Sequence, residues 1–360
     1  RAQRYAENRR EDFKSSTIVM ITEKSFKLIS RKSIKVSQEE LIKLSYFDSD
    51  NLFPLIVEPN VEDLNLLTWT RNNLDFIETR LLRHGAILFR NFSVNAVSQF
   101  EKFTRTICPD LLDYNERPAP RNEVKDQIYT STEFPASHEI YLHHEMSYSH
   151  NWPTKIWFYC EQPATLGGNT PIASDRKVFP LLDPKIVSRF SEKKIMYVRN
   201  YGEGVDLTWQ EVFQTQDRSE VEAYCRKAHM QFEWRSGDRL RTRQIRPAVV
   251  NHPRTGETVW FNHAHMFHIS SLEPAVRDSL LEEFKDDELP RNAFYGDGAP
   301  IEDAPLEEIR QTYRQAAVSF PWQKGDILML DNFLCSHGRD SFVGPRTILV
   351  AMAELYSDNA

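Results

Sequence analysis

The stretch "YLHHEMSY" at residues 141–148 places two histidines beside a glutamate, in a segment that otherwise favours a half-buried strand. Successive side chains of a strand point to opposite faces, so His143 and Glu145 would share one face and His144 would point away. An imidazole and a carboxylate two residues apart can bind the same metal ion. The spacing therefore favours His143 and Glu145 as a pair of metal ligands.

A metal site of this kind needs a further ligand from elsewhere in the chain. Two histidines and one carboxylate on one face of an ion form the site that suits non-haem Fe(II). His337 is the best candidate for the second histidine, because it follows the apolar segment "DILMLDN" (326–332) and precedes another apolar run. A short His-x-Glu match has low specificity, so the prediction depends on its combination with His337.

Strands predominate among the elements that must position these residues. The strand candidates are residues 155–161, 169–174, 326–332 and 346–355, with a pair joined by a turn over 248–265. Residues 61–85 predict one helix with Leu74, Ile77 and Leu81 on one face and a stop at Gly85. Helices do not alternate regularly with the strands, which disfavours a doubly wound parallel sheet. We expect a mainly β protein, an antiparallel roll or sandwich with flanking helices.

The overall composition excludes several classes of protein. No apolar run in the 360 residues approaches the ~18 that a membrane span needs. The net charge of -7 argues against the basic surface that nucleic-acid binding requires. The four cysteines have no paired spacing and follow no secretory signal, so we expect reduced, buried thiols in a cytoplasmic protein. Dinucleotide-binding, Walker, HExxH and nucleophile-elbow motifs are missing from the sequence.

Four segments, spread over most of the chain from residue 82 onward, carry a further signal. They are "LRHGAILFRNF" (82–92), "LHHEMSYSHNWP" (142–153), "PATLGGNTPIAS" (163–174) and "MLDNFLCSHGRDSFVGPRTILVAMAE" (329–354). In this order they resemble the TauD/TfdA family of Fe(II)- and 2-oxoglutarate-dependent dioxygenases, especially its hydroxylase-like branch from non-ribosomal peptide pathways. The resemblance implies a double-stranded β-helix (jelly roll) over residues 51–360, preceded by an N-terminal extension over residues 1–50.

The family pattern also implies roles for individual residues. The implied iron ligands are His143, Glu145 and His337, and the implied 2-oxoglutarate contacts are Thr170 and Arg346. A dicarboxylate's far end needs a planar, permanently charged partner, which explains an arginine, and Thr170 can donate its hydroxyl to the same carboxylate. Three protein ligands leave positions for 2-oxoglutarate and dioxygen. Many relatives have aspartate at the position of Glu145, and His144 becomes a rival ligand if the strand shifts by one residue.

The resemblance implies an oxidation coupled to the conversion of 2-oxoglutarate to succinate. Halogenating relatives lack the carboxylate ligand, so Glu145 favours hydroxylation or another oxygen-dependent outcome over chlorination. We expect hydroxylation of an unactivated C–H bond of an amino acid, free or carried as a thioester on a carrier protein. Glu139, Asn262 and His265 are candidate substrate contacts, with solvent-exposed or structural roles as the alternative. Arg339 is either a second anion contact or part of a structural salt bridge.

Two other interpretations remain open from the sequence. The segment "FNHAHMFH" (261–268) contains His263, His265 and His268, which could form the three-histidine site of a cupin-like metal enzyme that does not use 2-oxoglutarate. No carboxylate accompanies these histidines. The third interpretation is a degenerate jelly roll that acts as a binding module without catalysis.

Overall fold

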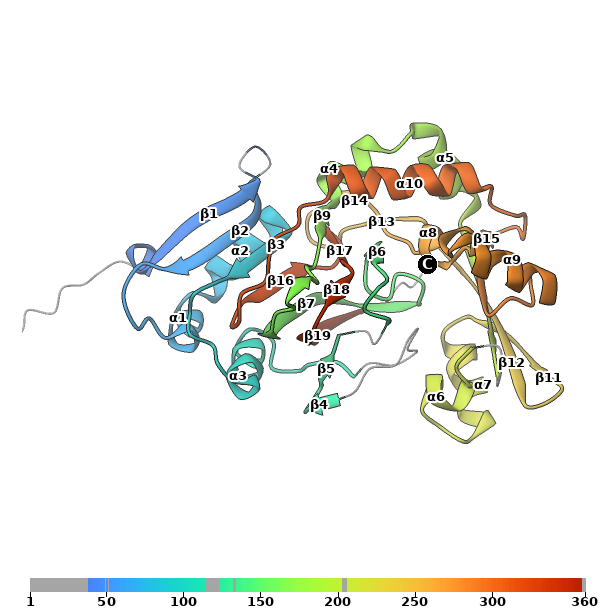
Figure 1. Cartoon of the computed structure of the whole chain (residues 1–360), viewed down its shortest axis with the longest axis horizontal. Coiled ribbons are helices and arrows are strands. Elements are labelled where there is room, and N and C mark those ends of the chain that lie inside the picture. The colour runs from blue at the N-terminus through green and yellow to red at the C-terminus, as the bar shows by residue number, and fades with distance from the viewer. Residues whose placement is uncertain are drawn as a thin grey trace, which may run out of the picture. The chain divides into compact units, whose positions relative to one another are not determined.

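A computed structural model describes residues 38–48, 50, 52–113, 123–131, 134–202 and 206–357. These residues belong to one compact unit, in which sheets of mainly antiparallel strands are surrounded by helices (Figure 1). The expectation of a mainly β protein with flanking helices is confirmed. In the part of the chain that the structure describes, no helix is both long and apolar enough to cross a membrane.

The largest sheet has eight strands in the order β1-β2-β3-β16-β7-β19-β5-β4. The strands are β1 (Ile42–Asp48), β2 (Phe53–Pro59), β3 (Ala86–Phe89), β16 (Ile327–Asp331), β7 (Asn151–Gln162), β19 (Thr347–Ser357), β5 (Ile128–Thr130) and β4 (Glu123–Lys125). Only β2 and β3 run parallel within it. Strand β1 lies in the extension predicted over residues 1–50, most of which is outside the described residues, and it pairs with β2.

Alternate side chains of the central strands are buried on both faces of this sheet. On one face, Trp157 and Leu349 share a core with helices α1 (Leu66–Asn72), α2 (Leu74–His84) and α3 (Val97–Ile107). On the other face, Phe158 and Val350 pack with residues of a second sheet. A shift of one residue would exchange the two sets, so burial on both faces determines the strand register. The four cysteines are buried free thiols, as predicted.

The prediction of one helix over residues 61–85 is wrong in one respect, because the structure contains two helices that meet at Asn73. Asn73 leaves the helical conformation, and its side-chain amide donates to a backbone carbonyl of α1 at 2.7 Å. Such local bonds let asparagine compete with helical pairing. Ile77 and Leu81 are buried as predicted, whereas Leu74, at the start of α2, is 40% exposed.

A three-stranded sheet in the order β6-β17-β9 contributes to the core on the second face of the large sheet. Its strands are β6 (Ile140–His143), β17 (Cys335–Arg339) and β9 (Ile172–Ser174), and a two-stranded sheet pairs β8 (Leu166–Gly167) with β18 (Phe342–Val343). Strand β16 belongs to the large sheet and β17 to the small one. Residues 332–334 between them therefore connect the two layers.

The remaining elements form a further sheet, a hairpin and the other helices (Figure 1). A four-stranded sheet in the order β11-β12-β10-β15 and a hairpin β13-β14 comprise β10 (Ile195–Tyr201), β11 (Gln231–Arg235), β12 (Arg239–Arg246), β13 (Val249–Asn251), β14 (Thr258–Trp260) and β15 (Arg291–Tyr295). The helices are α4 (Asp175–Leu181), α5 (Pro184–Lys193), α6 (Trp209–Phe213), α7 (Arg218–Lys227), α8 (Ala264–Phe267), α9 (Pro274–Glu283) and α10 (Asp303–Ala316), with short 3-10 turns at Gln38–Leu41 and Ile269–Ser271. Helices α4, α5, α8 and α10 share a core with β10 and β15.

A buried ion pair joins the end of β3 to the start of β16. Arg90 donates through Nε and Nη2 to the two carboxylate oxygens of Asp326, at 3.0 and 2.6 Å, and its Nη2 also donates to the carbonyl of Pro321 at 2.9 Å. The two side chains are 9% and 1% exposed. Removing either partner would leave the other charge buried and uncompensated.

We expect Asp326→Ala to lower the free energy of unfolding by about 3–5 kcal/mol, measured by urea denaturation, because Arg90 would keep its charge without a partner. The double variant Arg90→Met/Asp326→Leu, which leaves no buried charge, should regain a large part of that loss. Arg189→Ala is the control, since its ion pair with Glu302 is largely exposed and should contribute much less. Equal effects of the two alanine variants would contradict the prediction.

Candidate functional site

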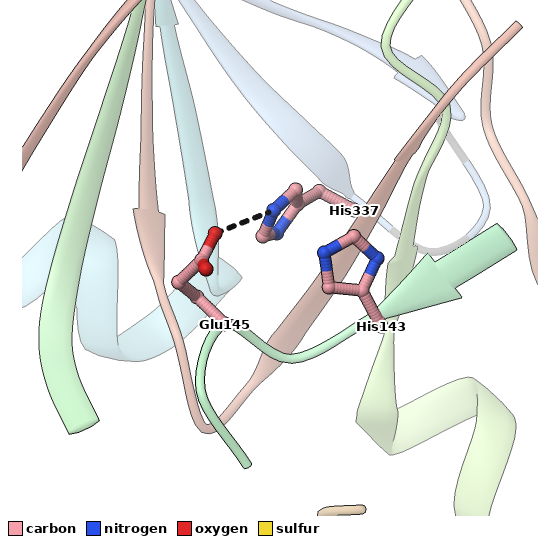
Figure 2. Close-up of side chains that lie close together, drawn as sticks. All are labelled: His143, Glu145 and His337. Atoms are coloured by element: carbon pink, nitrogen blue, oxygen red, sulfur yellow. Dashed lines mark ion pairs between the residues drawn. The ribbon is translucent and has the colours of Figure 1, made fainter. Parts of the chain in front are cut away.

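His143, Glu145 and His337 converge at one place, as the sequence predicts (Figure 2). Each residue offers one ligand atom, these atoms lie within 4.8 Å of one another, and all three side chains are buried. Nε2 of His337 is 3.6 Å from Oε2 of Glu145, and the two imidazole centroids are 4.5 Å apart. Within the described residues, no other group of three His, Cys, Asp or Glu side chains has this geometry.

Two adjacent strands position the histidines. His143 is the last residue of β6, and it pairs directly with His337 in the antiparallel strand β17. Side chains at such opposite positions start about 5 Å apart, which is close enough for two imidazoles to reach one ion. Gly338 follows His337, and a Cβ there would lie 2.5 Å from the carbonyl oxygen of Ile140. The glycine at position 338 therefore allows β6 and β17 to lie close to each other.

Glu145 lies beside the histidines because of a turn, and not because side chains alternate along a strand as the sequence suggests. Strand β6 ends at His143, and residues 144–149 form a turn. Met146, directly after the glutamate, has a φ of +59°, in the left-handed region that non-glycine residues adopt rarely. The prediction that a strand continues through Glu145 is wrong, although the residue does lie beside the two histidines.

The hydrogen bonds of the two neighbouring histidines distinguish their roles. Nδ1 of His143 donates to the carbonyl of Tyr141 at 2.7 Å. A carbonyl can only accept, so Nδ1 carries the proton and Nε2 keeps a lone pair that a metal can bind. His144 is turned away, with Nδ1 donating to the carbonyl of Asn332 at 2.6 Å and Nε2 3.8 Å from Oδ1 of Asp175. The rival ligand is therefore not part of the group.

A pocket adjoins the two histidines of this group. Phe158 of β7 and Ile348 and Val350 of β19 provide apolar walls, and its polar lining includes Thr170 and Arg346. The apolar residues come from the face of the large sheet that is turned toward the small sheet. The structure thus brings the two predicted histidine ligands and the predicted 2-oxoglutarate contacts to one cavity.

Arg346 is held in the pocket by neutral groups. Its Nε donates to the carbonyl of Gly168 at 2.8 Å, Nη1 to Oγ of Ser131 at 3.4 Å and Nη2 to Oγ1 of Thr170 at 3.5 Å. No carboxylate of the described residues forms an ion pair with it. Burial lowers the pKa of Arg346 to about 10, which still leaves the guanidinium charged at neutral pH. The pocket therefore contains a positive charge that a ligand carboxylate can neutralise.

The glycine step before Thr170 makes this arrangement possible. Gly168 has a φ of +69°, and a Cβ there would lie 3.0 Å from Cδ of Arg346 and 2.9 Å from Cβ of Ala164. Any other residue would be strained and would push against the arginine. The absence of a side chain lets the carbonyl of Gly168 accept from Arg346.

The hydroxyl of Thr170 is oriented by two donors. Nε1 of Trp322 donates to Oγ1 of Thr170 at 3.1 Å, and Arg346 donates to the same atom. A hydroxyl has two lone pairs and one proton, so the proton of Thr170 is available to an acceptor in the pocket. Sequence reasoning missed Trp322 and Ser131, because no local pattern links a tryptophan to a threonine 152 positions away.

The three candidate substrate contacts have different surroundings. Glu139 is exposed, next to a residue that lines the pocket. Asn262 is fully buried and donates to the carbonyl of Ala248 at 3.0 Å. His265, also fully buried, donates through Nε2 to the carbonyl of Leu142 at 2.9 Å, and burial lowers its pKa to about 3, so the ring is neutral. These bonds support the fold, and a substrate contact for the three residues stays a prediction.

Arg339 lines the pocket, and its guanidinium binds the loop of residues 134–138. Its two Nη atoms donate to the carbonyls of Phe134, Pro135 and His138 at 2.8, 2.7 and 2.8 Å. Of the two roles left open by the sequence, these bonds favour the structural one, although they are made to carbonyls and not to a carboxylate.

The alternative three-histidine site is not formed. His263 is bonded through Nδ1 to Oγ of Ser147 at 2.6 Å, and His268 through Nδ1 to Oγ of Ser270 at 2.9 Å. His265 lies in helix α8, where a strand was expected. These residues are absent from the one metal-competent group found in the described part of the chain.

Residues 51–352 match the family described as taurine catabolism dioxygenase TauD, TfdA family. The dapdiamide synthesis protein DdaC of Enterobacter agglomerans is 44% identical over 278 residues, which cover 77% of this chain and 84% of DdaC. A clavaminate synthase-like protein of Arabidopsis thaliana is 30% identical over 321 residues, 84% of this chain and 94% of that protein.

Solved structures share the fold. A structure of PvcB from Pseudomonas aeruginosa matches with a TM-score of 0.55 at 16% identity, over 90% of this chain and 97% of PvcB. A second PvcB structure, of an Fe, alpha-ketoglutarate dependent oxygenase from an isonitrile synthetic pathway, matches with a TM-score of 0.53 at 16% identity, over 91% of this chain and 97% of that one. The family match spans more than half of the sequence. The chain therefore belongs to the TauD/TfdA family and is a non-haem Fe(II)- and 2-oxoglutarate-dependent oxygenase.

Proposed function

We propose that this oxygenase hydroxylates an unactivated C–H bond of an amino acid in natural-product biosynthesis, with the amino acid free or carried as an aminoacyl or peptidyl thioester on a carrier protein. The observation that carries the oxygenase part is the His143, Glu145 and His337 group beside Arg346, which has no ion-pair partner among the described residues. The substrate class is supported by the 44% identity to DdaC, which is named for dapdiamide synthesis.

The residues present fit a ferrous ion. Two imidazoles and one carboxylate are the donor set typical of non-haem Fe(II) oxygenases, and His143, Glu145 and His337 would hold the ion. The chemistry supplied with iron bound would be dioxygen activation, coupled to the oxidative decarboxylation of 2-oxoglutarate to succinate and carbon dioxide, which provides the oxidising power for the C–H bond. The hydrogen bond from His143 Nδ1 to a backbone carbonyl would keep its Nε2 directed to the ion.

The pocket residues would bind the keto acid. Arg346 offers a cationic partner for the far carboxylate of 2-oxoglutarate, and Thr170 offers a hydroxyl proton to the same group. Phe158, Ile348 and Val350 line the same pocket with apolar groups, and their low polarity would strengthen the charge pairing. The co-substrate would then lie between its carboxylate anchor and the iron ligands.

For the fold we propose a jelly roll, built from the large sheet and the small β6-β17-β9 sheet that share a core. Its strands would include the elements that carry the two histidines. We place the dioxygenase domain at residues 51–360, which the family match over 51–352 supports, and regard β1 as an edge strand contributed by the extension of residues 1–50.

Anaerobic addition of Fe(II) and 2-oxoglutarate to the wild type should produce a visible metal-to-ligand charge-transfer band. His143→Ala and His337→Ala should abolish the band, because each removes one ligand. Glu145→Ala should lose hydroxylation. His138→Ala, which changes an exposed histidine, is the control and should keep the band. A band of full intensity in His337→Ala would remove that residue from the ligand set.

Arg346→Ala should raise the Kd for 2-oxoglutarate on the order of 10²–10⁴-fold, because a charged partner worth about 3–5 kcal/mol is lost. Iron binding should stay nearly unchanged. The Kd of Arg346→Lys for 2-oxoglutarate should lie between those of the wild type and Arg346→Ala, since a lysine keeps the charge without the bidentate geometry. Calorimetric titration with Fe(II) present measures the affinity. An unaltered Kd in Arg346→Ala would point to Arg339 as the anchor.

The substrate class can be tested by succinate formation from 2-oxoglutarate with a panel of free amino acids and aminoacyl-pantetheine thioesters. We expect one member to stimulate succinate formation and to gain one oxygen atom from ¹⁸O₂. If a stimulating compound loses two hydrogens without gaining oxygen, the reaction is desaturation and not hydroxylation. No stimulation in an enzyme that binds iron and 2-oxoglutarate would contradict the substrate class.

A further inference from the structure

The backbone at Glu145 lies beyond regular sheet pairing. Strand β6 ends two residues earlier, at His143, and the following Met146 has a left-handed conformation. A carboxylate on such a turn needs another constraint, because a shift of about 1 Å in a metal ligand is enough to weaken a site. The structure shows which side chain provides that constraint.

The side chain of Asn332 bonds to both backbone groups of Glu145. Its Oδ1 accepts from the N–H of Glu145 at 2.8 Å, and its Nδ2 donates to the carbonyl of Glu145 at 2.9 Å. This reciprocal pair resembles the bonds between two paired strands. The second proton of Nδ2 goes to the carbonyl of Pro153 in β7 at 2.9 Å. The orientation of the amide is unambiguous, because only its nitrogen can face two carbonyls.

The backbone of Asn332 makes two further bonds to the same region. Its carbonyl accepts from Nδ1 of His144 at 2.6 Å, and its N–H donates to the carbonyl of Thr154 at 2.8 Å. Asn332 is fully buried. It thereby joins the turn that carries the glutamate to strand β7 of the large sheet.

Asn332 also lies in the connection between β16 and β17, five residues before His337. The connection that leads to one imidazole therefore also holds the backbone of the carboxylate, although 187 positions separate Asn332 from Glu145. The distance between the carboxylate and this imidazole, 3.6 Å between their nearest atoms, depends on both ends of this link.

We propose that Asn332 is a positioning residue of the iron site, which keeps the Glu145 carboxylate in register with His337. The inference rests on the ligand set proposed above. Asn332 touches neither substrate nor metal and acts through the backbone of Glu145. Supporting groups of this kind contribute 10–100-fold to metal affinity in proteins.

The test compares Asn332→Asp with the wild type by titration of the metal-free 360-residue chain with Co(II), followed by its visible spectrum. The aspartate keeps the size of the side chain and the acceptor for the Glu145 N–H, but it turns an oxygen toward the carbonyls of Glu145 and Pro153. We expect the Kd for Co(II) to rise about 10–100-fold. Thermal unfolding of the metal-free protein measures the general loss of stability separately.

Asn292→Asp is the matched control. Asn292 is also buried, and its Oδ1 accepts from the backbone N–H groups of Ile269 and Ala293, away from the site. It should lose thermal stability without a change in Co(II) affinity. An unchanged affinity in Asn332→Asp, or equal losses in both variants, would overturn the role of Asn332. A wild type that does not bind Co(II), or Fe(II) with 2-oxoglutarate, would instead overturn the proposed ligand set together with it.

Discussion

The antiparallel pairing of β6 with β17 is the constraint on which the site depends. It sets His143 directly opposite His337, 194 positions away in the chain, so that two imidazole centroids are 4.5 Å apart. Strand β17 is the central strand of its sheet and is held on both sides, by β6 and by β9. Two of the three proposed ligand positions are therefore as rigid as the sheet itself, and the carboxylate is the proposed ligand that requires a separate support.

The second constraint is electrostatic. Arg346 is largely withdrawn from water among carbonyl and hydroxyl groups, and burial lowers its pKa to about 10. A part-buried charge with no ion-pair partner among the described residues disfavours folding, and a dicarboxylate that binds in the pocket would offset this cost. The arrangement thus favours ligands with two acidic ends, one for the metal and one for Arg346. The neutral neighbours keep the guanidinium directed without neutralising it.

The sequence allowed the site residues to be predicted better than the geometry that unites them. The spacing of His143 and Glu145, the apolar strands around His337 and the Gly-Gly step before Thr170 are local patterns, and each can be recognised from neighbouring residues. Strand alternation, however, was the wrong reason for pairing His143 with Glu145, because the strand ends at the histidine. Contacts such as Asn332 with Glu145 join segments far apart in the chain, and no periodicity predicts them. The break of the helix at Asn73 was missed for a related reason, since side-chain bonds to the backbone override propensity.

Two adjacent polar residues, Asp331 at the end of β16 and Asn332 directly after it, form hydrogen bonds where the chain passes from one layer to the other. Oδ1 of Asp331 accepts from the N–H groups of Phe333 and Leu334, which closes the turn into β17. Asn332 points the other way and bonds to Glu145. Side chains thus replace main-chain pairing at the point where β6 stops. The pocket begins beside this point, next to His143 and His337, so the residues that replace the strand pairing also form the surroundings of the candidate site.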